Sequence, residues 1–304
     1  MKQKILITGT NGLLGQKLVY ALAPRTEYGV IATARGENRL LSKEGYVYES
    51  LDIGDSSAVE KVIARHQPDI IIHSAAMTNV DECEIKKEEC WKINVDAVEY
   101  LLTAAGKIQA HFIHVSTDFI FDGTSGPYTE EGLPNPVSYY GESKLAAEKL
   151  VQKYKGKWAI ARTVLVYGLV DNMSRSNIVL WAKGALEKGS PINVVDDQFR
   201  TPTLAEDLAD GCILIADKKA TGIYNISGKD QLSIIQIVEK VADYYKLDKS
   251  LIRPVSSATL NQTAKRPPIT GFVLDKACKD LDYQPHSFEE GIALLEVQMK
   301  KHKQ

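Results

Sequence analysis

Short, uninterrupted apolar runs alternate with amphipathic stretches through the first half of the chain. Apolar runs of about four to eight residues are typical of strands buried on both faces of a parallel sheet. Stretches with apolar residues three and four positions apart predict the helices that connect such strands. The predicted strands cover 4–8, 30–33, 46–48, 70–73, 112–115 and 158–163, and the predicted helices include 55–66, 82–106 and 138–154.

This alternation predicts an α/β fold with a doubly wound, Rossmann-like parallel sheet and a smaller, mixed C-terminal domain. The pattern loosens after the strand at 158–163, so we expect the first domain to cover 1–165 and the second to cover mainly 166–304. Some segments of the second half, such as the amphipathic stretch 204–216, are predicted to return to the first domain.

Composition narrows the function without revealing it. The chain has 304 residues, of which 44% are hydrophobic and 25% charged, as in ordinary globular proteins. A net charge of -2 gives no electrostatic reason to expect nucleic acid or an anionic membrane as a partner. The four cysteines lack the spacing of metal-binding pairs, so we expect reduced thiols and no metal. No apolar segment has the length of a signal peptide or a membrane span, and we therefore expect a cytoplasmic protein.

A glycine-rich turn separates the first predicted strand from an amphipathic helix. Its sequence, Gly9-Thr10-Asn11-Gly12-Leu13-Leu14-Gly15, has the spacing Gly-x-x-Gly-x-x-Gly. Glycines let backbone amides approach a pyrophosphate, and a helix N-terminus supplies positive potential. Such a turn can also be a tight connection without a ligand, but its place between strand and helix favours dinucleotide binding. The residues expected to contact a cofactor are Gly9, Asn11, Gly12, Leu13 and Leu14.

The end of the second strand bears on which dinucleotide would bind. An acidic residue there would bind the ribose 2′-hydroxyl of NAD, whereas an arginine can pair with the 2′-phosphate of NADP. The sequence has Arg35 at this place and Arg39 soon after it. We therefore expect NADP(H) as the preferred cofactor and NAD(H) as the alternative, unless both arginines are simply solvated loop charges.

Further cofactor contacts are expected after the third and fourth strands. Asp52 and Ile53 follow the third strand, where the carboxylate either caps a turn or faces an adenine edge. Small residues after the fourth strand let the backbone approach a ligand, and the segment there is Ala75-Ala76-Met77. Asn94 interrupts the apolar stripe of the next predicted helix. Because a buried asparagine needs partners, it either braces the catalytic segment through backbone carbonyls or makes a purely structural hydrogen bond.

Thr117, Tyr140 and Lys144 are the candidates for chemistry. Tyr140 and Lys144 are four residues apart on a predicted helix and therefore share one face. An ammonium beside a phenol stabilises the phenolate, so we expect a lowered pKa for Tyr140. Thr117 lies at the carboxyl end of the fifth strand, where ligands of open parallel sheets bind. His114 within that strand is interpreted as a core histidine.

These features together resemble the extended short-chain dehydrogenase/reductase superfamily. Within it, the chain is most similar to the dTDP-4-dehydrorhamnose reductase family over nearly its whole length. The stretches that carry this resemblance are the glycine-rich turn, 116–123, 140–145 and 195–203, with a looser fit at Arg266-Pro267 and Leu274-Asp275.

The resemblance implies a reductase that converts the 4-keto group of a dTDP-linked deoxysugar, dTDP-4-dehydrorhamnose, to dTDP-L-rhamnose with hydride from NAD(P)H. Tyr140 would donate the proton, Lys144 would hold the nicotinamide ribose, and Thr117 would bind the carbonyl oxygen. The C-terminal domain would bind the sugar nucleotide, and a homodimer is compatible with the sequence. The residues expected at the substrate are Asp118, Phe119, Gln198, Arg200 and Arg266.

Departures from the family pattern leave alternatives open. Arg200 stands where the family commonly has glycine, which leaves the identity of the sugar nucleotide open. Related dehydratases have Asp-Glu after the threonine, whereas this chain has Asp118-Phe119, which argues against dehydration. Another sugar-nucleotide reductase or an epimerase remains an alternative. So does a catalytically silent subunit similar to the regulatory subunit of methionine adenosyltransferase, although the presence of Thr117, Tyr140 and Lys144 favours an enzyme.

Overall fold

A seven-stranded parallel sheet forms the centre of the molecule. The computed structural model describes residues 2–172, 176–260 and 262–302. The strand order is β3-β2-β1-β4-β5-β6-β11, and every neighbouring pair is parallel. The strands are β1 (Gln3–Thr8), β2 (Tyr28–Ala34), β3 (Tyr46–Ser50), β4 (Ile70–His73), β5 (His111–Thr117), β6 (Trp158–Thr163) and β11 (Gly222–Asn225). The predicted Rossmann-like sheet is confirmed, and its order reverses between β1 and β4, which is where such sheets bind nucleotides.

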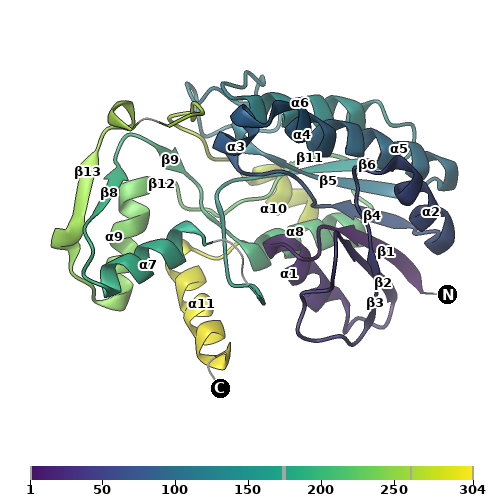
Figure 1. The fold of residues 1–304 in the computed structure, drawn as a ribbon, viewed down its shortest axis with the longest axis horizontal. Coiled ribbons are helices and arrows are strands. Elements are labelled where there is room, and N and C mark those ends of the chain that lie inside the picture. Colours follow the sequence, from purple (N-terminus) through teal and green to yellow (C-terminus); the bar gives the residue numbers. More distant parts are fainter. Residues whose placement is uncertain (1, 173–175, 261, 303–304) are drawn as a thin grey trace.

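Helices cover both faces of this sheet (Figure 1). Side chains alternate between the two faces of a strand, and the central strands are apolar on both, so each face builds its own core. One face packs against α1 (Leu13–Leu22), α8 (Ala205–Asp217) and α10 (Asp275–Leu281). The other packs against α2 (Ser56–His66), α5 (Ala97–Ile108) and α6 (Tyr139–Gln152).

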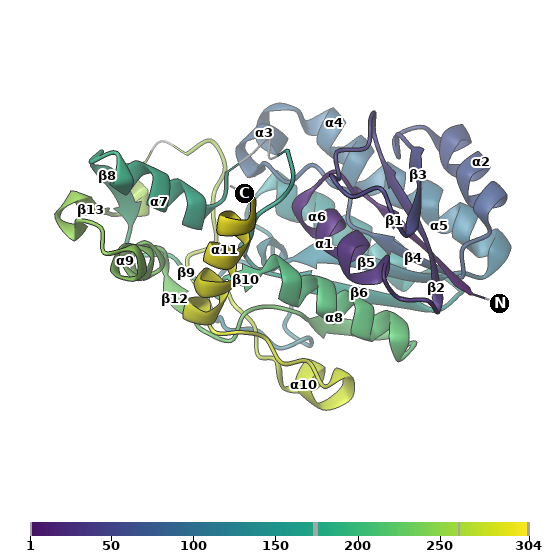
Figure 2. The same ribbon diagram turned by 90° about the horizontal axis from the view of Figure 1, so that it is seen from below.

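The second half of the chain builds a smaller core beside the sheet (Figures 1 and 2). This core contains α7 (Ile178–Glu187), α9 (Ile234–Tyr245), α11 (Phe288–His302) and the parallel strands β8 (Ile192–Val195) and β13 (Ile252–Val255). Two further pairs are β7 (Val166–Tyr167) with β10 (Thr203–Leu204) and β9 (Phe199–Arg200) with β12 (Leu232–Ser233). The division at residue 165 stays a prediction, while α8 and β11 lie with the sheet although they follow that position.

The single helix predicted over 82–106 is wrong. The structure has α3 (Val80–Ile85), α4 (Lys87–Trp91) and a π-helical turn, η1 (Lys92–Asp96), before α5. Lys86 leaves helical geometry at φ −108° and ψ 59°, which separates α3 from α4. The π-helical turn contains Asn94, whose side chain bonds the backbone of Met77 outside the helix. The periodicity of apolar residues does not predict a π-helical turn. Such turns are frequent at functional sites.

Side-chain caps fix where three of the helices begin. Asp55 accepts hydrogen bonds from the second and third residues of α2. Ser138 accepts one from the Gly141 amide at 3.3 Å, so α6 begins at Tyr139 and Tyr140 lies in its first turn. Ser287 and Glu290 bond each other's backbone amides and form a capping box at the start of α11.

Candidate functional site

The glycine-rich turn has a conformation that larger residues could not adopt. Gly9 has φ +75°, and a Cβ there would lie 2.9 Å from the backbone of Ala75. A Cβ on Gly15 would lie 2.3 Å from the Gly9 carbonyl oxygen. Gly12 is the N-cap of α1, and no side chain caps that helix. The turn therefore brings β1, β4 and an uncapped helix N-terminus together, which is the geometry that binds a pyrophosphate.

A cavity of about 320 Å³ opens at the carboxyl ends of β1, β2 and β4, beside this turn. Seven of the predicted cofactor residues line it, although they come from four separate parts of the sequence. They are Gly9, Arg35, Asp52, Ile53, Ala75, Ala76 and Met77. Glu82 of α3 and Glu89 of α4 also line the cavity, and neither was predicted from the sequence as a site residue.

Arg35 and Asp52 differ in how they are held. Arg35 is exposed, and no hydrogen bond or ion pair joins its guanidinium to another described residue. Asp52 accepts a hydrogen bond from the Gly54 amide at 2.9 Å, so its carboxylate caps a turn while it lines the cavity. The open cationic group at this position is the feature that a 2′-phosphate would use.

The other predicted cofactor residues do not line the cavity: Asn11, Gly12, Leu13, Leu14, Asn94, Tyr140 and Lys144. Asn11 donates to the Glu37 carbonyl at 2.8 Å and accepts from the Arg39 amide at 2.9 Å, which fastens the loop after β2. Leu14 is buried in the core beneath the turn, and Leu13 is half-buried at the start of α1. Asn11, Leu13 and Leu14 are not among the described residues that line the cavity.

Asn94 is buried and hydrogen-bonded, and its two predicted roles, a brace of the catalytic segment and a purely structural bond, stay predictions. Its Oδ1 accepts from the Met77 amide at 2.8 Å, and its Nδ2 donates to the Met77 carbonyl at 3.0 Å. The same Nδ2 lies 3.1 Å from the Ser143 hydroxyl on α6. Asn94 therefore joins the wall of the cavity to the helix that carries Tyr140 and Lys144, and it acts through hydrogen bonds within the protein.

Thr117, Tyr140 and Lys144 meet at the carboxyl end of β5. The Lys144 ammonium donates to the Val115 carbonyl at 2.8 Å, two residues before Thr117. An interaction with the Thr117 hydroxyl lowers the pKa of Tyr140, which places the two hydroxyls beside each other. The Thr117 hydroxyl also donates to Asp118 Oδ1 at 3.1 Å. The structure thus brings together the three residues predicted to carry chemistry.

The predicted lowering of the Tyr140 pKa is wrong. Burial raises this pKa well above its usual range, and the smaller effect of Thr117 does not offset it. The Lys144 ammonium bonds Val115 and His114. Burial also lowers the pKa of Lys144 to about 8, against the opposing charges of Glu148 and Cys90. Tyr140 is therefore a protonated phenol at neutral pH, which suits a proton donor.

Arg200, a predicted substrate residue, is buried and fully engaged within the protein. Its guanidinium donates to the carbonyls of Phe199, Pro267 and Pro268 at 2.7–3.1 Å. Its Nε lies 3.8 Å from Asp118 Oδ2, which also accepts a hydrogen bond from Thr270. Arg200 and Asp118 thus fasten β9 and the loop at 267–270 to the end of β5, and in this structure neither charge is open to solvent.

The remaining predicted substrate residues are divided between the site and its supports. The Phe119 ring packs edge-on against the Tyr140 ring, with 5.8 Å between their centroids. Gln198 is buried next to β9. Arg266 pairs with Asp81 of α3 at 2.7 Å, and the Ala264 amide donates to the same carboxylate at 2.9 Å. The pairing of Arg266 with Asp81 was not predicted, because the two partners lie 185 positions apart.

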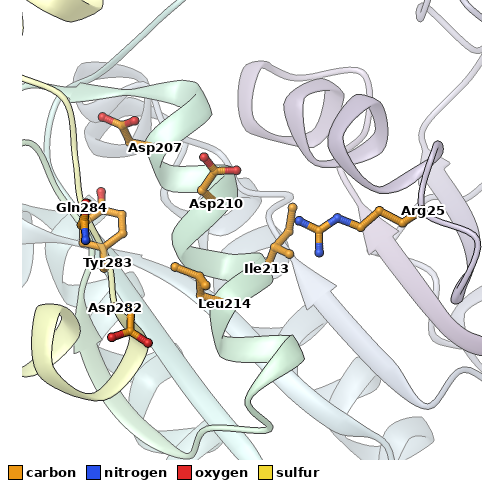
Figure 3. A pocket seen from close by; sticks show the side chains of 8 residues that line it. All are labelled: Arg25, Asp207, Asp210, Ile213, Leu214, Asp282, Tyr283 and Gln284. Carbon is orange, nitrogen blue, oxygen red and sulfur yellow. The ribbon is translucent and has the colours of Figure 1, made fainter.

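A second cavity, of about 370 Å³, lies away from the strand ends (Figure 3). Asp207, Asp210 and Leu214 follow one another along α8 in its wall, and Arg25 faces them from beyond α1. Both oxygens of Asp207 accept hydrogen bonds from His286, and Arg25 pairs with Asp217 at 3.0 Å. This cavity contains none of the residues predicted to act on a ligand.

Neither a membrane-spanning helix nor a metal cluster is present among the described residues. None of the described helices has the length and apolar character needed to cross a bilayer. Within 2–172, 176–260 and 262–302, no three His, Cys, Asp or Glu side chains are grouped so that they could hold a metal ion.

Comparison with known proteins places this architecture in a family. Methionine adenosyltransferase 2 subunit beta of Xenopus laevis is 32% identical over 86% of this chain and 78% of its own length. The dTDP-4-dehydrorhamnose reductase of Aggregatibacter actinomycetemcomitans is 30% identical over 95% of this chain and 97% of its own. The crystal structure of dTDP-4-dehydrorhamnose reductase from Bacillus anthracis, in complex with NADP, superposes with a TM-score of 0.86 at 29% identity, covering 98% of this chain and 100% of that chain.

The sequence profile described as the RmlD substrate binding domain matches residues 3–300. This range includes the glycine-rich turn, the cavity and the cluster of Thr117, Tyr140 and Lys144. The chain therefore belongs to the RmlD substrate binding domain family.

Proposed function

We propose that this protein reduces the 4-keto group of a dTDP-linked deoxysugar, converting dTDP-4-dehydrorhamnose to dTDP-L-rhamnose. The observation that carries the proposal is the meeting of Thr117, Tyr140 and Lys144 at the end of β5, beside a cavity built for a dinucleotide. Similarity to dTDP-4-dehydrorhamnose reductases over nearly the full chain supports this choice of substrate.

The side chains divide the chemistry between them. A bound reduced nicotinamide supplies the hydride to the carbonyl carbon. The Tyr140 phenol, which is protonated at neutral pH, donates the proton to the oxygen on which negative charge develops. The Thr117 hydroxyl orients that oxygen, and the buried Lys144 ammonium would hold the nicotinamide ribose. Tyr140 and Thr117 thus act on charge that is larger in the transition state than in the substrate.

NADP(H) is the proposed cofactor, with NAD(H) as the alternative. Arg35 lines the cavity with its guanidinium exposed and engaged by no described partner. The segment after β2 places no carboxylate in the lining, so it offers no acceptor for a ribose 2′-hydroxyl. Both observations favour a ligand that carries a 2′-phosphate.

A nucleotide-binding subunit without turnover is the second candidate. It is favoured by the 32% identity to methionine adenosyltransferase 2 subunit beta over 86% of the chain. Such a protein would keep the cavity and bind the dinucleotide while reducing no sugar. The two candidates differ in what happens after the cofactor binds, and turnover therefore separates them.

The decisive experiment follows NADPH and NADH oxidation with dTDP-4-dehydrorhamnose and identifies the product by mass and NMR. Tyr140→Phe should lower kcat by about 10²–10⁴-fold, the usual contribution of a general acid, and leave the NADPH dissociation constant within about twofold. Tyr139→Phe, which removes the neighbouring hydroxyl on the same helix, is the matched control and should retain near-full turnover. Full activity in Tyr140→Phe would refute the assigned role, and NADPH binding without turnover in the wild type would support the silent subunit.

A further inference from the structure

A row of buried polar side chains crosses three strands directly beneath the proposed active site. The Thr8 hydroxyl lies 2.8 Å from His73 Nδ1, and the His73 ring stacks on the His114 ring with 5.4 Å between their centroids. His114 Nε2 in turn lies 3.2 Å from the Lys144 ammonium. All four side chains are almost completely buried. Lys144 therefore contacts an imidazole in a part of the core where most other side chains are apolar.

The strand register explains how the sequence assembles this row. Thr8 of β1 pairs with His73 of β4, and His73 pairs with His114 of β5. Alternation along β5 directs His114 to the same face as Phe112, which lies in the core under α5 and α6. Lys144 comes down onto that face from α6. The interpretation of His114 as a core histidine described its burial and missed its contact with Lys144.

Burial determines the protonation states in this row. It lowers the pKa of His73 to about 3 and holds the pKa of His114 well below its usual value, with the Lys144 charge acting in the same direction. His114 is therefore neutral at physiological pH and has one ring nitrogen that can accept a hydrogen bond. The nitrogen that faces the Lys144 ammonium is Nε2, so this nitrogen is the acceptor and Nδ1 carries the proton.

Other titratable groups around His114 and Lys144 come from three elements besides β5. His73 faces His114 from β4, and Glu148 of α6 and Cys90 of α4 oppose the lowering of the Lys144 pKa. Glu148 is held by Arg162 of β6 through two hydrogen bonds of 2.8 and 3.0 Å, so most of its charge is already balanced. His114 and the Val115 carbonyl are the acceptors that contact the ammonium directly.

We propose that His114 is a positioning residue for Lys144: its Nε2 accepts a hydrogen bond from the ammonium, holds that group at the end of β5 and keeps it charged. This role deepens the proposed reductase function and rests on it. Desolvation disfavours the charged form of a buried amine, and a hydrogen-bond acceptor restores part of the lost stabilisation. A bond to a charged group contributes enough to shift a pKa by about one unit.

The test compares His114→Leu, which removes the acceptor and fills similar space, with His114→Gln, whose amide oxygen can take the place of Nε2. Activity that needs the ammonium falls as pH rises through the Lys144 pKa, which is about 8 in the folded protein. In His114→Leu the alkaline limb of kcat/KM should move to lower pH by about one unit. In His114→Gln it should stay near the wild-type position, while the NADPH dissociation constant at pH 6.5 stays within about twofold in both variants. If the leucine variant does not fold, His114→Met gives the same comparison.

A second readout does not depend on turnover. NMR of protein with ¹³C-labelled lysine follows the Cε resonance of Lys144 with pH, and Lys144→Arg identifies that resonance by its disappearance. We expect its midpoint to fall by about one unit in His114→Leu and to stay in His114→Gln. An unchanged midpoint in His114→Leu, or a midpoint that rises, would overturn the proposal. A wild type that binds NADPH without turnover, but whose Lys144 midpoint still falls in His114→Leu, would refute the reductase function and leave the contact between His114 and Lys144 established.

Discussion

Arg35 was predicted to contact the cofactor, and Arg200 and Arg266 were predicted to contact the substrate. The structure places their guanidinium groups in opposite environments. Arg35 projects from the loop after β2 with an exposed guanidinium. Arg200 is 3% exposed, and three backbone carbonyls and Asp118 surround its guanidinium. Arg266 is held by Asp81. An arginine at a motif position is therefore open to a ligand in one region and part of the protein's own framework in the other.

The physical reason is the origin of the partners. Arg35 lies in the loop after β2, and no hydrogen bond or ion pair joins its guanidinium to another described residue. The partners of Arg200 lie 67 and 68 positions further on and in Asp118, so folding brings them to it. A buried charge must be paired, and once it is paired it has little left to offer a ligand.

The largest effect expected from this comparison is on stability. Arg200→Met should lower the free energy of unfolding by about 3–5 kcal/mol, because it leaves Asp118 buried without its cation and the Pro267 carbonyl without its donor. Arg35→Met is the matched control and should change it by less than about 0.5 kcal/mol, as exposed substitutions do. Urea unfolding followed by circular dichroism measures both. Equal effects in the two variants would mean that the regions do not differ as described.

A smaller effect on stability is expected from two histidines, His111 and His286. Like the arginines, one of them lacks a partner of opposite charge and the other has one. Burial lowers the pKa of His111 in β5 to about 4, and no carboxylate is among the groups that act on it. In the substrate half, His286 faces the Asp207 carboxylate. Between the unfolded pKa near 6.5 and the folded value, the unfolded chain binds more protons, so stability is lost as pH falls through this window.

His111→Leu should therefore reduce the loss of stability between pH 7 and pH 5 by about 1–2 kcal/mol relative to the wild type. Urea unfolding at pH 7, 6 and 5 measures the difference. An unchanged pH dependence in His111→Leu would show that His111 is not the buried titrating group.

Sequence alone sufficed where structure depends on local pattern. The apolar runs such as Ile70–His73 and the cap at Asp55 follow from alternation and from side-chain chemistry within a few residues. The fold and the grouping of Thr117, Tyr140 and Lys144 follow because parallel strands end at one edge of the sheet. The break at Lys86 was missed, although four charged residues, 86–89, interrupt the apolar pattern there.

The electrostatic environment could not be read from the sequence. The lowered pKa predicted for Tyr140 assumed that Lys144 faces the phenol, but Val115 and His114 engage the ammonium and burial dominates. Spacing on a helix shows that two side chains share a face; it does not show which third group lies between or beneath them. The sequence did place His73 and His114 in two predicted strands, and the register of β4 and β5 sets these two residues side by side.

The cofactor cavity offers a smaller effect, on binding. Arg35→Ala should weaken NADPH about tenfold, since it removes one charge-assisted pairing with the 2′-phosphate, and should leave NADH almost unchanged. Fluorescence titration of both dinucleotides measures the ratio. Arg39→Ala is the neighbouring control, because Arg39 is exposed on the same loop but does not line the cavity. Equal losses for NADPH and NADH would mean that Arg35 does not read the 2′-phosphate.

The smallest effect is expected at the pair of Arg266 and Asp81. These side chains are partly exposed, at 20% and 37%, so solvent screens their attraction, and their coupling energy should stay below about 1 kcal/mol. A double-mutant cycle of Arg266→Ala and Asp81→Ala, measured by urea unfolding, gives this energy directly. The same variants show whether Arg266 also serves a ligand. If it only fastens the loop to α3, the two single variants should raise KM for the sugar nucleotide equally; a larger rise in Arg266→Ala would mean that the pair opens and that the guanidinium binds the substrate.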